Sequence, residues 1–410
     1  MIRLKDSVIS LAGVVAGQIS LFLCVSLIGR SQGPAVLGHF NYLLACGTFA
    51  GTLLGFRYEL ACVSDSPRYA FNALVNVTVF SATVMVVAIC VTLAMSHGEL
   101  LAVESYAFAF LVQQATSSYL NSFRRYDLIA ASRLAINGSF LLCLLTERWT
   151  GTLHGLDVFR TYSVINVLLT VLSLAGVLLH GRRHGYRAQI GLAFFSENRR
   201  FATFILPSTI CGSVLTYSLA IIIPQWFDAE SAGYFAAAYR LGFFPVSLIG
   251  QSLGSVFRRD AIGALAHCDA DMLLHRVFMT YAKFLVLIAI AYGAGSALLF
   301  SSLVRIFFGT SWRGASDFFY DLVPLFAVQL IYVPLSQIFL VTREQRLDFL
   351  FQFGSALVLS STLYTTHILS FSPHSSVRAF SFAGVVTMLV GLALTYQVMK
   401  CSALRLRKVA

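Results

Sequence analysis

The stretch VNVTVFSATVMVVAICVTLAM, from Val75 to Met95, contains no charged residue. A bilayer core about 30 Å thick needs about 20 residues of helix to cross it. Inside lipid only a helix or a closed barrel satisfies every backbone hydrogen bond. A barrel strand would have about ten residues with strict in/out alternation, which this stretch lacks. It therefore predicts a membrane-spanning helix.

Eleven further apolar stretches of similar length follow the same pattern and are separated by short polar breaks. The twelve are Val8–Ile28, Val36–Phe56, Val75–Met95, Leu100–Tyr119, Leu128–Leu145, Phe159–Leu179, Phe201–Ile223, Ala232–Val256, Phe278–Leu299, Phe318–Val341, Phe349–Ile368 and Phe380–Met399. With 58% hydrophobic and 11% charged residues, the chain leaves no room for a sizeable soluble domain. It is predicted to be an all-α polytopic membrane protein with about 12 transmembrane helices.

The placement of the basic residues predicts the orientation. With a cytoplasmic N-terminus, 22 of the 29 Lys and Arg residues fall on cytoplasmic flanks, and Arg240 falls inside a span. The remaining six, on the opposite side, are Arg30, Arg148, Arg160, Arg305, Arg313 and Arg378. This bias follows the positive-inside rule, so both termini are predicted to be cytoplasmic. The basic loops themselves are explained by contact with anionic lipid headgroups.

The chain divides into two halves of six spans. We expect an N-terminal lobe over residues 1–180, a cytoplasmic loop over 181–200, and a C-terminal lobe with a basic tail over 201–410. Six is an even number, so a parallel internal repeat is allowed. A shift of 195 positions aligns Gly38 with Gly233, Phe40 with Phe235, Gly47 with Gly242, Phe49 with Phe244 and Gly55 with Gly250. The repeat implies a two-lobed transporter with a pathway between the lobes.

Arg240 is the clearest polar residue inside a predicted span. An arginine in the hydrocarbon region costs roughly 2.5–3.5 kcal/mol on insertion scales, so it needs a cavity, a partner or a function. Gly242 and Pro245 follow it and are expected to bend or loosen the helix, which favours a water-filled lumen. The alternative is that Arg240 extends to the nearby outer interface.

Arg57 and Glu59 close the second span, and Arg30 ends the first. Because residues two apart do not share a helix face, a salt bridge between Arg57 and Glu59 is not assured. An ordinary cytoplasmic flank explains this pair equally well. Arg30 lies on an outer flank otherwise poor in cations, so it could attract an anion there.

Other polar residues are secondary candidates. Asp321 is deep enough to respond to protons or cations, although a carboxylate that caps the start of a helix at headgroup level fits it better. Asp228, Glu230 and Asp317, like Asp321, are expected at the outer rim, where they would be solvated. Asn41 and Gln251 could hydrogen-bond sugars, and contacts between helices explain them equally well.

The sequence contains no catalytic constellation. It has no GxSxG elbow, Walker A sequence, HExxH motif or Gly-rich nucleotide turn. The cysteines show no CxxC spacing and are expected to be small buried hydrophobes. We therefore expect no enzyme activity, no catalytic residues, no metal, no cofactor and no nucleic acid.

Four motifs resemble one family of membrane proteins. SAGYFAAAYRLGFFPVSLIGQSLGSVF at Ser231–Phe257 is similar to the eighth span of the Wzx-type O-antigen and exopolysaccharide flippases, and of the related MurJ family of lipid II flippases. These families belong to the multidrug/oligosaccharidyl-lipid/polysaccharide (MOP) superfamily. The other matches are GPAVLGHF with FRYELA at Gly33–Ala61, FFGTSWRGASDFF at Phe307–Phe319, and the segment Val323–Asp348.

The resemblance implies a V-shaped MOP/MATE-like transporter of two lobes lined by cations. Its substrate would be an undecaprenyl-pyrophosphate-linked oligosaccharide, flipped from the cytoplasmic to the outer leaflet of the bacterial inner membrane for surface polysaccharide biosynthesis. Arg240 and Arg57 would hold the pyrophosphate, with Arg30 as a third candidate, because arginine suits bidentate phosphate recognition. Glu59, Asp321, Gln251 and Asn41 would be coupling or secondary polar residues. Implied partners are membrane lipids, a polysaccharide polymerase and a chain-length regulator.

Two other functions stay open. An ion-coupled multidrug exporter of the same superfamily predicts carboxylates along the pathway, whereas the best intramembrane ionisable residue here is a cation. A non-transporting membrane assembly partner predicts no need for a buried arginine.

Overall fold

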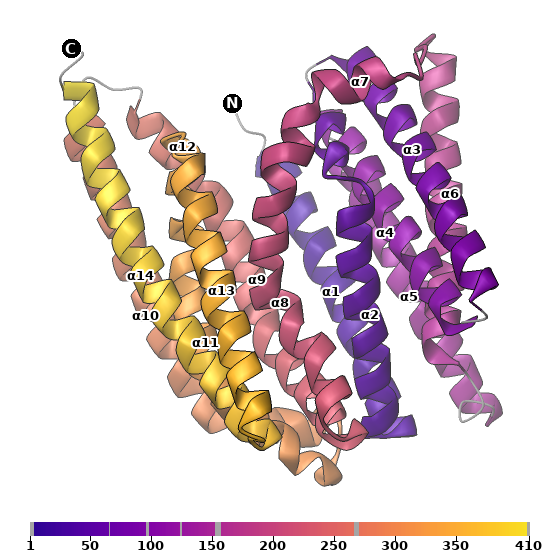
Figure 1. Ribbon diagram of the computed structural model, residues 1–410, viewed down its shortest axis with the longest axis vertical. Helices are drawn as coiled ribbons and strands as arrows, with labels where there is room; N and C mark the ends of the chain where they lie inside the picture. Colours follow the sequence, from indigo (N-terminus) through magenta and orange to yellow (C-terminus); the bar gives the residue numbers. More distant parts are fainter. Residues whose placement is uncertain are drawn as a thin grey trace. The chain divides into compact units, whose positions relative to one another are not determined.

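A computed structural model describes residues 4–64, 66–95, 98–123, 125–151, 157–265 and 270–407. Within these residues the regular structure is helical, without a β-strand. The chain forms two compact units, Met1–Ser213 and Val214–Ala410, and the boundary between them falls inside one helix. Figure 1 shows the helices.

The first unit contains α1 Leu4–Gln32, α2 Pro34–Leu54, the 3₁₀ turn η1 Tyr58–Cys62, α3 Pro67–Ala94, α4 Gly98–Ser122, α5 Tyr126–Thr150, α6 Val158–Arg183, α7 Leu192–Glu197 and the π-helical turn η3 Phe201–Ile205. The helix α8, Leu206–Trp226, crosses the boundary. The second unit contains α9 Ala229–Leu265, α10 Ala270–Phe307, the 3₁₀ turn η4 Thr310–Trp312, α11 Arg313–Leu335, α12 Ile338–Val341, α13 Gln345–Ile368 and α14 Pro373–Arg407.

The predicted fold class is confirmed. In the described part of the chain, each of the twelve predicted spans coincides with a long helix: α1 to α6, α8 to α11, α13 or α14. By length and composition, nine candidate spans in the described ranges are long and apolar enough to cross a membrane. Several continue past the apolar stretch, since a helix does not have to end where the lipid does; α9 and α10 are the longest examples. The protein is a multi-pass membrane protein.

Each unit is built around its own central helix. In the first unit α4 packs against α2, α3 and α6, while α1 packs against α5. In the second unit α11 packs against α9, α10 and α14. These neighbours run side by side in Figure 1.

The internal repeat has a structural counterpart in the way α2 and α9 use their glycines. A Cβ atom at Gly47 or Gly51 of α2 would lie within 2.6 Å of Tyr106 or Ala107 of α4. A Cβ atom at Gly242 of α9 would lie 2.5 Å from Phe319 of α11. The aligned glycines Gly47 and Gly242 therefore each bring their helix into close contact with the central helix of its own unit, and Gly51 adds a second such contact in α2.

Gly51→Ala is expected to destabilise the protein by about 1–3 kcal/mol, because the new Cβ would meet a backbone carbonyl, at Ala107, that cannot rotate away. Gly138→Ala on α5 is the matched control, since nothing lies within 4 Å of its Cβ position. We expect the control to raise helix stability by up to about 1 kcal/mol. Thermal unfolding of both variants in detergent measures the difference. Equal stability of the two variants would contradict this account of the α2–α4 contact.

The polar interval 181–200 packs as part of the first unit. Asn72 Oδ1 accepts a hydrogen bond from the backbone N–H of Gln189 at 2.7 Å, and Asn76 Nδ2 donates to the Gln189 carbonyl at 2.9 Å. Phe194 of α7 is buried in the same core. These contacts make the interval part of the first unit, Met1–Ser213.

Candidate functional site

The segment after α2 brings Arg57 and Glu59 together. Phe56 and Arg57 adopt left-handed backbone conformations, with φ of 46° and 63°, so α2 stops and η1 begins. An Arg57 guanidinium nitrogen then lies 2.8 Å from Glu59 Oε1. The helix-face argument against this salt bridge does not apply, because the residues are not in an α-helix.

The salt bridge is largely buried. The Glu59 side chain is 4% exposed and the Arg57 side chain 25%. Glu59 Oε2 and Arg57 Nε have no hydrogen-bond partner among the described residues. Burial raises the pKa of Glu59, an effect that the neighbouring Arg57 opposes. The pair therefore keeps unused hydrogen-bonding capacity.

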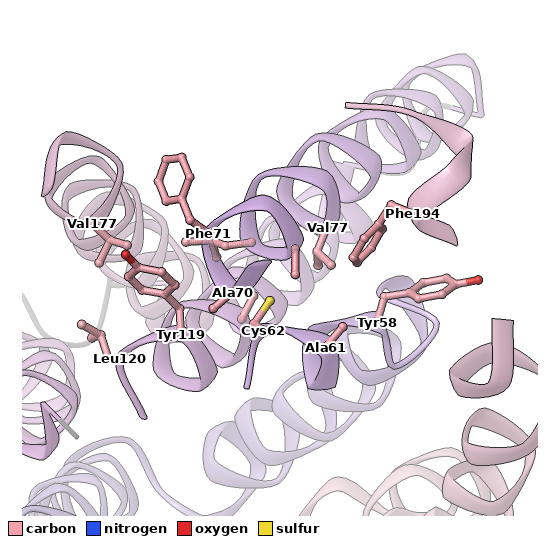
Figure 2. Close-up of a cluster of buried hydrophobic side chains, with 13 residues drawn as sticks. Tyr58, Ala61, Cys62, Ala70, Phe71, Val77, Tyr119, Leu120, Val177 and Phe194 are labelled. Atoms are coloured by element: carbon pink, nitrogen blue, oxygen red, sulfur yellow. The ribbon is translucent and has the colours of Figure 1, made fainter. Parts of the chain in front are cut away.

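The turn that carries this pair is held by a packed core. Figure 2 shows Tyr58, Ala61 and Cys62 of η1 beside Phe71 and Val77 of α3, Tyr119 and Leu120 of α4, and Phe194 of α7. The Ser122 hydroxyl donates to the Cys62 carbonyl and accepts from the Ser64 backbone N–H, both at 3.0 Å. These contacts oppose relaxation of the left-handed residues.

Arg240 lies in an unbroken helix. α9 continues from Ala229 to Leu265 through Gly242 and Pro245, so neither residue ends the helix, and the bend expected there stays a prediction. Gly242 serves as the contact with Phe319, and its carbonyl accepts a hydrogen bond from the Tyr292 hydroxyl at 2.9 Å. Arg240 is partly buried, next to a Tyr239 ring that stacks on Phe243. Its function stays a prediction.

Asp321 is not solvated, contrary to expectation. Its side chain is 6% exposed, and its oxygens lie 2.8 Å from Arg378 Nε and 3.1 Å from His374 Nδ1, both on α14. Asp228, Glu230 and Asp317 are exposed, as expected for rim residues. No pattern in the sequence indicates the contacts of Asp321, since its partners are 53 and 57 positions away.

For the remaining candidate residues, Arg30, Asn41 and Gln251, the structure gives fewer contacts. Arg30 is exposed near the end of α1, where Arg148 of α5 donates to the neighbouring Ser31 hydroxyl at 3.1 Å. Arg148, which sequence reasoning missed as a site residue, thus adds a second cation to this end of the first unit. Asn41 is buried on α2. The side chain of Gln251 lies outside the described residues.

Part of the chain matches the model of a protein family. Residues 160–317 match the model of a family described as "polysaccharide biosynthesis protein". This region runs from α6 to the start of α11 and includes Arg240. No curated protein sequence matches the chain significantly.

Solved structures establish the fold. An inward-facing multidrug resistance MATE family transporter of the MOP superfamily superposes with a TM-score of 0.71 at 14% identity, covering 94% of this chain and 95% of that chain. The lipid II flippase MurJ, in an inward closed conformation, gives 0.72 at 12% identity, covering 99% and 92%. The MATE multidrug transporter DinF-BH gives 0.66 at 13% identity, covering 96% and 94%.

The expected resemblance is confirmed by these findings together. The protein has the fold of the MOP-superfamily transporters, and part of it is similar to polysaccharide biosynthesis proteins. At these identities the structural likeness shows the fold alone, and it is equally strong for a flippase and a drug transporter.

Proposed function

We propose that the protein is a flippase that moves a lipid-linked oligosaccharide from the cytoplasmic to the outer leaflet, for surface polysaccharide biosynthesis. The carrier lipid would be undecaprenyl pyrophosphate and the membrane the bacterial inner membrane, with both termini cytoplasmic. The observation that carries this proposal is the match of residues 160–317 to the polysaccharide biosynthesis family, on a transporter fold. A hydrophilic glycan with a pyrophosphate cannot cross hydrocarbon unaided, so such a step needs a protein.

Charge supports an anionic substrate. Glu59 and Asp321, the buried acidic residues of the described part of the chain, are each paired with an arginine, whereas Glu104 of α4 accepts a hydrogen bond from Thr92 and is in none of the described salt bridges. An exporter of cationic drugs would need such a carboxylate to be available to its substrate. Arg240, by contrast, is a partly buried cation in the region that matches the polysaccharide family.

Arg57 would bind the substrate by exchanging its partner Glu59 for the pyrophosphate. Pyrophosphate oxygens accept bidentate hydrogen bonds from a guanidinium, as a carboxylate does. Binding of the substrate to Arg57 would therefore compete with Glu59, which is held only 2.8 Å away. Arg57, Arg240 and Arg30 are each proposed separately as substrate-binding residues, and not as parts of one joint site.

The proposal is tested by removing the protein from cells. Depletion should reduce surface polysaccharide and cause lipid-linked oligosaccharide to accumulate on the cytoplasmic leaflet, where enzymes added to inside-out vesicles can reach it. Re-expression should reverse both effects. Normal surface polysaccharide together with loss of efflux of a fluorescent cationic dye would favour the multidrug exporter instead. If neither property changed, the assembly-partner alternative would become the better one.

A further inference from the structure

A cavity of about 550 Å³ lies in the second unit, between the end of α10 and the start of α11. This volume is within the range of about 300–1,000 Å³ typical of ligand sites. Of the polar residues that the sequence singled out, Asp317, expected at the outer rim, lines it. The polar residues of its wall that matter here are Ser302, Arg305, Thr310, Arg313, Ser316 and Asp317.

The charge of the wall favours an anion. Neither Arg305 nor Arg313 takes part in any of the salt bridges of the described residues. Arg313 is the first residue of α11, whose N-terminus has no side-chain cap. A cation at this end opposes the helix dipole, and Arg313 forms no salt bridge with Asp317, the opposite charge one turn further along α11. An anion in the cavity would be attracted by Arg313 and by the N–H groups of the first turn of the helix.

Ser316 adds a hydrogen-bonding side chain to the wall of the cavity. It is 8% exposed and lines the cavity, and in the described part of the chain its side chain has no hydrogen bond. The Ser316 hydroxyl oxygen is not one of the fully buried polar atoms without a partner, so it is accessible to solvent. A ligand oxygen in the cavity would supply the missing partner.

The position of the cavity indicates where the anion comes from. The candidate spans Met272–Phe307 and Thr310–Val341 follow one another here, so we expect the cavity at the end of two membrane crossings, where lipid phosphates lie. Leu298, four residues before Ser302 and on the same face of α10, is 79% exposed. Leu299, the next residue, and Ile306, about two helical turns further along α10, are also exposed. An apolar strip on α10 therefore leads along the membrane into the polar cavity.

We propose that this cavity binds the phosphate group of a lipid, with the hydrocarbon chains of that lipid lying along α10. Arg305 and Arg313 would hold the phosphate, Ser316 would donate a hydrogen bond to it, and Asp317 would weaken binding by repulsion. Both phospholipids and a polyprenyl phosphate have this chemistry. The proposal is independent of the transport function.

The test measures lipid retention by the purified full-length protein, using native mass spectrometry with phosphatidylglycerol, phosphatidylcholine or polyprenyl phosphate. Arg305→Gln with Arg313→Gln should weaken binding of the anionic lipids about tenfold or more. Asp317→Asn should strengthen it, an effect of opposite sign that damage to the fold would not produce. The control is Arg258→Gln with Arg259→Gln, exposed cations of α9 that should leave binding unchanged.

The lipids tested show which kind of molecule supplies the phosphate group that the cavity binds. Loss of polyprenyl phosphate binding alone would assign the cavity to the carrier lipid, and loss of both anionic lipids to lipid phosphates in general. Full displacement by inorganic phosphate would overturn the lipid assignment in favour of a soluble phosphate ligand. Unchanged retention in the double glutamine variant, or weaker retention in Asp317→Asn, would overturn the site.

Discussion

Arg240→Ala is expected to abolish glycan export while leaving the amount of folded protein in the membrane unchanged. If the guanidinium makes two charge-assisted hydrogen bonds to the pyrophosphate, their loss amounts to about 3 kcal/mol or more, or at least about a hundredfold in rate or affinity. The partly buried position of Arg240 strengthens such bonds relative to water. Surface polysaccharide on cells that express the variant, compared at equal protein level, measures the effect.

Two further variants make the Arg240 result specific. Arg240→Lys should restore export in part, because the charge remains but the bidentate geometry is lost. Arg258→Ala removes an exposed cation from the same helix and should leave export unchanged. Full activity of Arg240→Ala would remove Arg240 from the proposed binding site, and equal loss in Arg258→Ala would point to a general effect of charge.

The second large effect is expected for Arg57→Ala, through stability. Removal of one partner from a buried salt bridge costs about 3–5 kcal/mol, because the other charge stays buried without compensation. The Glu59 side chain is 4% exposed and meets this condition. The quarter exposure of Arg57 places the expected loss near the lower end of the range, since water already screens the pair. Unfolding in detergent at neutral pH measures it.

The loss should depend on pH in a defined direction. Burial raises the pKa of Glu59 even with Arg57 present, so without Arg57 the folded state favours the protonated carboxyl still more. Only the ionised Glu59 carboxylate is destabilised by being buried without a partner. The stability loss should therefore be largest above the folded-state pKa, which exceeds the usual value of about 4.3, and should shrink as the pH falls through it.

A double variant checks the cause. Arg57→Ala with Glu59→Gln should recover most of the stability at neutral pH, because no buried charge remains. Unchanged instability of the double variant would show that Arg57 stabilises the protein through packing and not through its charge.

Part of the site could be predicted from the sequence. Arg57, Glu59 and Arg240 are recognisable as polar residues at or within apolar stretches. The contact between Arg57 and Glu59 was not predictable from spacing, since it requires the left-handed backbone at Phe56 and Arg57, and that conformation depends on the packed turn around Tyr58 and Cys62. The use of Gly242 was not predictable either, since its contact with Phe319 of α11 and the hydrogen bond that its carbonyl accepts from Tyr292 join residues far apart in the sequence.

The sequence by itself determined the membrane-spanning helices and the repeated glycines of α2 and α9. Both follow from local physics: lipid requires about twenty apolar residues per crossing, and close helix contact requires small ones. Only the tertiary structure decided which charges are neutralised and where a cavity opens. Asp321 meets Arg378 and His374 because α11 packs against α14, and Arg305 and Arg313 share a cavity because α10 ends where α11 begins. Such contacts join residues whose separation along the chain has no fixed period, so no pattern in the sequence encodes them.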